Sequence, residues 1–136
     1  MGDVAWFNIT FKKSDLERVN NALKDEEWND DIWEDDHPSG KPITMTATIY
    51  EANYGGTAIT DALIAENISF DACYGSGGSY GPGALVHIEG EQAEVSTDIE
   101  GTPVVIYERD GISERDEKHV KKYYALLKKV EKYFED

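Results

Sequence analysis

The side chains best suited to covalent chemistry lie in the middle of the chain. Cys73, His87 and Asp71 are the residue types that a thiol nucleophile, its general base and an orienting acid require. Their spacing does not specify that they meet, and an acidic neighbourhood raises the pKa of a thiol and so lowers its thiolate fraction. We therefore expect no catalytic residues. A small hydrolase or transferase is the weakest of the functions considered.

A glycine-rich segment, residues 75–83, raises the question of phosphate binding, because successive backbone N–H groups can form an anion site. A strand rather than a helix is expected after it, and no lysine follows its last glycine, so the P-loop and dinucleotide patterns lack their required context. The surrounding carboxylates would also repel a phosphate. We interpret this segment as a structural or partner-shaped loop, with Tyr74 and Tyr80 as its contact residues.

The negative charge is concentrated in the middle of the sequence. The chain has 28 acidic and 13 basic residues, a formal net charge of −15. Residues 25–108 hold 18 of the acids and a single base, Lys41, whereas both ends of the chain are nearly balanced. The negative electrostatic potential that these carboxylates create favours a basic partner and disfavours direct binding of nucleic acid.

The densest cluster lies in residues 25–36, where eight of twelve side chains are carboxylates. They are Asp25, Glu26, Glu27, Asp30, Asp31, Glu34, Asp35 and Asp36. Oxygen ligands of this type suit calcium or magnesium, but the EF-hand order is absent, so we expect loose counterions, no specific metal site and no cofactor.

Two conformations of residues 25–36 remain open from the sequence. Blocks of like charge repel one another, which is typical of a solvated or disordered loop. Trp28, Ile32 and Trp33 argue against that, because they could hold the segment to the core as a short helical turn or serve as exposed anchors.

The elements that would position these residues follow from hydrophobic periodicity. Residues 4–11 and 43–50 alternate in the strand period, and residues 68–73 also indicate a strand. Ser14 with Glu17 forms a capping-box pattern that predicts a short helix from about Asp15 to Lys24. Thr57 or Thr60 is expected to cap a second, brief helix.

The later part of the chain indicates three more strands and a long helix. Ala84–Ile88 and Gln92–Ile99 should form a hairpin through residues 89–91, and Pro103–Glu108 should form a final strand. From Ser113 an apolar stripe at helical spacing continues almost to the end of the chain.

The hairpin suggests a second acidic surface. Alternation in the second of its strands places Glu94, Asp98 and Glu100 on one face, about 6.6 Å between positions two apart. That is roughly half the linear charge density of a nucleic-acid strand, and Glu89, Glu91 and the cluster in residues 25–36 would add to it. Ordinary solvent-facing strand residues would look the same.

Together these patterns predict one α+β domain over residues 1–136. We expect a mainly antiparallel sheet of about five to six strands, with a short N-terminal helix and a long C-terminal helix packed on one face. A single cysteine and the absence of an apolar span or export pattern favour the cytoplasm and no membrane association.

Two binding functions are consistent with these patterns. The first is a non-enzymatic nucleic-acid mimic that occupies the basic surface of a nucleic-acid-binding protein, as inhibitors of restriction or CRISPR systems do. The second is an adaptor that contacts its partner through Trp28, Trp33, Tyr74 and Tyr80. A homodimer is compatible with either function.

Overall fold

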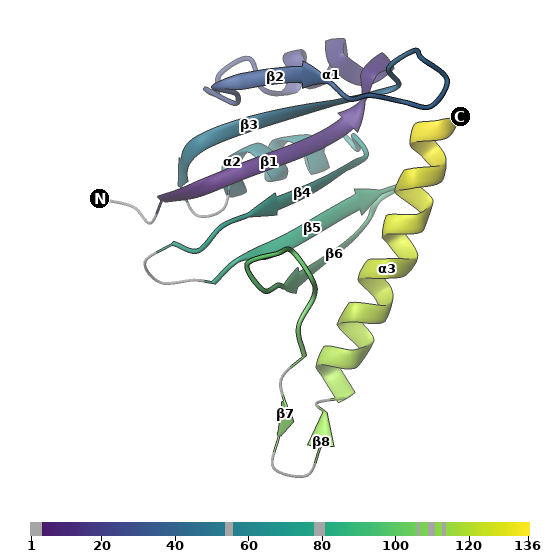
Figure 1. Ribbon diagram of the computed structural model, residues 1–136. Helices are drawn as coiled ribbons and strands as arrows, with labels where there is room; N and C mark the ends of the chain where they lie inside the picture. The colour runs from purple at the N-terminus through teal and green to yellow at the C-terminus, as the bar shows by residue number, and fades with distance from the viewer. Residues whose placement is uncertain (1–3, 54–55, 78–80, 106, 109–110, 113) are drawn as a thin grey trace.

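The fold is a six-stranded antiparallel sheet with helices on both faces (Figure 1). The computed structural model describes residues 4–53, 56–77, 81–105, 107–108, 111–112 and 114–136. The strand order is β2-β3-β1-β4-β5-β6, which confirms the α+β class. The strands are β1 (Val4–Lys12), β2 (Asp31–Glu34), β3 (Thr44–Asn53), β4 (Phe70–Tyr74), β5 (Gly83–Ile88) and β6 (Glu91–Ser96).

The described helices and a small ribbon complete the architecture. The helices are a 3-10 turn η1 (Lys13–Asp15), α1 (Leu16–Ala22), α2 (Thr57–Ala65) and α3 (Glu114–Glu135). A two-stranded ribbon, β7 (Tyr107–Glu108) and β8 (Gly111–Ile112), lies apart from the main sheet (Figure 1). None of the helices described combines the length and apolar character that crossing a membrane requires.

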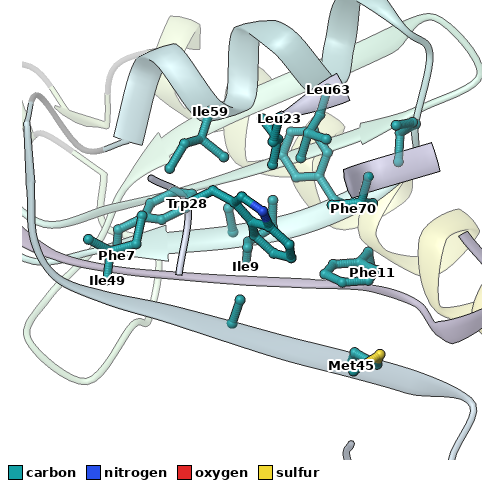
Figure 2. Close-up of a cluster of buried hydrophobic side chains, with 14 of the residues drawn as sticks. Phe7, Ile9, Phe11, Leu23, Trp28, Met45, Ile49, Ile59, Leu63 and Phe70 are labelled. Atoms are coloured by element: carbon teal, nitrogen blue, oxygen red, sulfur yellow. The ribbon is translucent and has the colours of Figure 1, made fainter. Parts of the chain in front are cut away.

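The core on one face of the sheet depends on the alternation in β1. Phe7, Ile9 and Phe11 are fully buried and share one cluster with Leu63 of α2 and with Leu23, the residue directly after α1 (Figure 2). The strand period predicted from residues 4–11 is therefore confirmed. Because β1 lies in the middle of the sheet, this row fixes the register of both neighbouring strands.

The long helix α3 covers the opposite face. Val86 of β5 and Val95 of β6 pack with Leu126, Val130 and Phe134 of α3 in a second cluster. The helices thus divide between the two faces, whereas the sequence pattern predicted them on one face. The reason lies in β5, where an almost continuous apolar run is buried on both sides, as in strands covered by helices above and below.

The C-terminal end of α3 is attached to the far end of β1. The Tyr133 hydroxyl donates to Asp15 Oδ2 at 2.6 Å, and Lys12 Nζ donates to the backbone carbonyl of Asp136 at 2.6 Å. His37 Nε2 lies 3.0 Å from a carboxylate oxygen of Glu135. These contacts hold the loop after β2, the end of β1 and the helix terminus together.

Several local predictions are corrected by the structure. The capping box does not form, because Ser14 lies in the 3-10 turn and Asp15 is the N-cap of α1 without a side-chain cap. Gly56 rather than a threonine precedes α2 as its N-cap. Pro103–Glu108 is not a strand of the main sheet, since Pro103 makes only an isolated bridge to Thr97.

The predicted hairpin is confirmed. Glu89 and Gly90 connect β5 and β6 with φ values of 50° and 78°, so both central residues of the turn are left-handed. That is the geometry of a two-residue turn whose twist matches the flanking strands.

Candidate binding surface

The residues that could have formed a thiol catalytic site lie on opposite faces of the sheet. Cys73 packs toward α3, whereas His87 is 1% exposed and stacks on Phe70 in the other core. The His87 Nδ1–H group donates to the carbonyl of Ile68 at 2.8 Å. Burial, followed by the charge of Asp71, raises the pKa of the Cys73 thiol. The arrangement therefore separates His87 from Cys73 and leaves the thiol with little thiolate for nucleophilic chemistry.

Two glycines of the glycine-rich segment allow close packing of aromatic rings. A Cβ added at Gly75 would lie 2.3 Å from the Trp6 indole nitrogen, and one at Gly83 would lie against the Tyr74 ring. Tyr74 donates its hydroxyl proton to Glu94 Oε2 at 2.5 Å. Tyr80, the other predicted contact residue, lies outside the described residues.

Residues 25–36 are ordered by the sheet and by one tryptophan. Trp28 is buried, and its ring centroid lies 6.1 Å from that of Phe11 (Figure 2). After it, β2 pairs antiparallel with β3 from Asp31 to Glu34. The segment thus contains a four-residue edge strand instead of a helical turn, and Trp28 holds it to the core, as one of the two expectations required.

Three of its carboxylates bind groups of the protein itself. Asp35 accepts hydrogen bonds from the hydroxyls of Thr44 and Thr46, each at 2.9 Å. Glu34 forms a 2.8 Å ion pair with Lys13, and Asp30 Oδ2 accepts the backbone N–H of Tyr50. No group of three or more metal-ligating side chains occurs among the residues that the structure describes.

The other five carboxylates of the segment are exposed, and so is Asp30 despite its bond to Tyr50. We use the name β2-edge surface for the exposed carboxylates around this strand: Asp25, Glu26, Glu27, Asp30, Asp31 and Asp36. Trp33 is 42% exposed and lies beside them on β2, opposite Thr46. The predicted anchors therefore separate into a buried Trp28 and an exposed Trp33.

The row of carboxylates that the sequence predicted along the hairpin does not form. Strand β6 ends at Ser96, and Asp98 instead stabilises a turn by accepting the backbone N–H groups of Glu100 and Thr102. Ile99, which strand alternation would place on the face opposite these carboxylates, is 91% exposed in this turn. Because the strand stops, the carboxylates lose the even spacing that a strand would impose.

The hairpin carboxylates also point in different directions. Glu91 lies 3.4 Å from Lys129 of α3, whereas Glu94 contacts Tyr74 on the opposite face of the sheet. Exposed Glu89 belongs to the turn itself. The hairpin thus offers scattered charges rather than one acidic strip.

The two acidic regions lie at opposite edges of the sheet, with β2 at one edge and β6 at the other (Figure 1). Five strand spacings separate them, roughly 24 Å at about 4.8 Å per spacing. The two regions are therefore separate surfaces at opposite edges of the sheet and do not form one continuous acidic surface.

A cavity of about 820 Å³ adjoins the β2-edge surface. Its lining includes Glu26, Glu27 and Asp30, together with Tyr50 and Glu51 from β3. Neither of the last two residues was among the predicted site residues. The signal available in the sequence was the end of the regular Thr alternation at Tyr50, where the strand pairing becomes irregular.

The β2-edge surface and its cavity are the features best suited to recognition of a partner. They combine fixed negative charge, an exposed aromatic ring and a concave shape. No protein-family model, curated protein or solved structure matches this chain, so the functional argument depends on its own residues.

Proposed function

We propose that this protein is a non-enzymatic acidic binding protein that occupies a basic surface of a nucleic-acid-binding protein. The observation that carries the proposal is the β2-edge surface, whose carboxylates belong to a folded edge strand and to a loop held by buried Trp28. Charges in fixed positions lose little conformational entropy when a partner binds, unlike those of a flexible tail.

The charge distribution supports competition with nucleic acid. Lys and Arg side chains that bind phosphates meet a dense negative surface, and both kinds of complex gain from release of counterions. Nucleic acid itself would be repelled by the same surface. The free Cys73 agrees with the cytoplasm as the place where such a competition occurs.

A second candidate is an adaptor that binds through exposed aromatic rings. Trp6 and Trp33 are 44% and 42% exposed, and tryptophan often anchors protein interfaces. In this case Trp33→Ala would abolish partner binding, whereas removing nearby charges would leave it intact.

Competition against DNA tests the first proposal. A labelled duplex is bound to each member of a panel of nucleic-acid-binding proteins, and displacement by the acidic protein is followed by fluorescence anisotropy at low and high salt. We expect displacement that weakens steeply with salt. Failure to displace the duplex from every member of the panel contradicts the proposal.

A matched pair of variants separates position from bulk charge. One variant removes four charges from the β2-edge surface by the substitutions D25N, E26Q, E27Q and D31N. The control removes four exposed charges elsewhere by E17Q, E66Q, E89Q and E100Q, two of them from the hairpin region. We expect the first variant to lose displacement and the control to retain it. Equal losses would mean that net charge alone acts.

A further inference from the structure

The cavity beside the β2-edge surface runs along an unpaired part of a strand. Strand β2 pairs with β3 only from Met45 to Thr48, so in the described structure the outer edge of residues 49–53 has no strand beside it. Asp30, which precedes β2, continues the pairing with β3 by one residue through two hydrogen bonds. Its N–H donates to the carbonyl of Thr48, and its carboxylate accepts the N–H of Tyr50, each at 2.8 Å.

The lining of the cavity has one sign of charge. Four carboxylates, those of Glu26, Glu27, Asp30 and Glu51, line it, and no Lys or Arg side chain is among the lining residues. They come from the loop after α1 and from β3, so two sides of the cavity are acidic. A cation entering here would meet several oxygens that approach from different directions.

The apolar and aromatic part of the lining selects among cations. Tyr50 is 63% exposed, and Ile49, Ala52 and Ile59 supply apolar surface. A guanidinium group can stack on an aromatic ring while it donates in its plane to carboxylates, and its aliphatic stem can cover apolar surface. A compact hydrated ion would leave the apolar part of the cavity in contact with water.

We propose that an extended, arginine-bearing segment of a partner protein binds in this cavity and adds as a strand beside residues 49–53 of β3. Its backbone would pair with the free strand edge, and its arginine side chains would enter the acidic cavity. The edge of residues 49–53 spans about 17 Å at 3.3 Å per residue. Because Asp30 already accepts the N–H of Tyr50, the groups available to the segment begin at the Tyr50 carbonyl, enough to pair roughly three of its residues. This inference rests on the proposed function and specifies how the partner is held.

Binding of a synthetic peptide tests the charge recognition. The probe is a labelled short peptide of alternating Thr and Arg, and the protein variants are E26Q/E51Q in the cavity and E89Q/E100Q elsewhere. Both variants lose two charges. We expect the cavity variant to bind roughly tenfold more weakly, as two exposed ion pairs warrant, and the control variant to change little. Equal weakening of both variants overturns the cavity as the site.

Backbone methylation tests the addition as a strand. One peptide carries N-methyl groups on its threonines and another on its arginines, so each lacks the N–H donors along one edge while keeping its charge. Strand addition predicts that one methylated peptide loses binding and the other retains it. Equal affinity of the two methylated peptides and the parent peptide overturns the strand pairing.

The two proposals fail in different ways. If the protein displaces DNA from a basic protein but does not bind the alternating peptide, the proposed function stands and the extended-segment inference is wrong. If it neither displaces DNA nor binds the peptide, both are wrong.

Discussion

The carboxyl group of Asp71 should make the protein less stable as the pH rises. Asp71 lies on β4 opposite Thr10 of β1, on the face that α3 covers. Burial, and then the negative charges of Glu131 and Asp35, raise its pKa from 3.8 to about 6. The ionised form is therefore disfavoured in the folded protein relative to the unfolded chain.

The sign and size of the effect follow from proton linkage. Because the pKa is higher in the folded state, the stabilisation is complete below pH 3.8 and is lost as the pH rises through 6. A difference of about two pKa units corresponds to about 3 kcal/mol in total, of which about 1.4 kcal/mol falls between pH 5 and pH 8.

The substitution Asp71→Asn removes this titration while keeping a side chain of similar size. Urea unfolding at pH 5 and pH 8 measures the free energy of unfolding, and both pH values lie above the region where the net charge approaches zero. We expect the variant to be more stable than the wild type at pH 8, and to lose about 1.4 kcal/mol less between the two pH values.

Two comparisons make this prediction refutable. Asp36→Asn removes the same charge from an exposed position and should leave the pH dependence as in the wild type. Asp71→Asn should also lower the pKa of Cys73, since the Asp71 charge contributes to raising it, and alkylation of the thiol against pH measures that shift. If Asp71→Asn and the wild type lose stability in parallel, the buried carboxyl is not the cause.

Three further predictions concern packing and hydrogen bonds. Trp28→Ala should lower the free energy of unfolding by about 3–5 kcal/mol, because it leaves a cavity beside Phe11. A loss below about 1 kcal/mol, measured by urea unfolding, would refute this prediction. Gly75→Ala should lower the melting temperature measured by circular dichroism, because its Cβ would overlap the Trp6 indole, and an unchanged value would contradict that overlap. Tyr133→Phe should cost about 1 kcal/mol in urea unfolding by removing the bond to Asp15, and equal stability would show that this bond contributes nothing.

The parts of the fold that the sequence predicts are those where one local pattern decides the structure. The alternation in β1 and β3, the helical stripe of α3 and the Glu89-Gly90 turn each specify an element without help from distant residues. In β3, Met45, Ala47 and Ile49 are buried, as the alternation of residues 43–50 predicts, although Thr48 between them is buried too.

The parts that were missed depend on contacts between distant segments. Strand β2 consists of Asp31, Ile32, Trp33 and Glu34, and two charged residues in four do not suggest a strand by propensity. It forms because the edge of β3 offers backbone partners and Thr44 and Thr46 bind Asp35 directly after the strand. The sequence contains these residues but does not indicate that they meet.

The same limitation explains the candidate site. The sequence identified the carboxylates of residues 25–36 but not Glu51, which joins Glu26 and Glu27 only because β3 passes beside the loop after α1. It also grouped these acids with those of the hairpin, although the sheet order separates the two regions. Charge counted along the chain therefore identified candidate residues, and strand order decided which of them can act together.

Acidic side chains at a sheet edge can have a purely protective role. Charged residues on an edge strand discourage pairing with a second molecule, and Asp31 and Glu34 of β2 fit that role because they lie on the edge strand itself. Glu26 and Glu27 do not fit it, because they precede the strand and line a cavity that leads to a different, unpaired edge at residues 49–53. Complete protection of that edge would require covering it, for example with β2 extended by a few residues. Instead, no strand covers the edge at residues 49–53 in the described structure, and carboxylates and the exposed Tyr50 lie beside it. Because these carboxylates repel a second copy of this acidic chain and attract positive charge, the edge favours a basic strand.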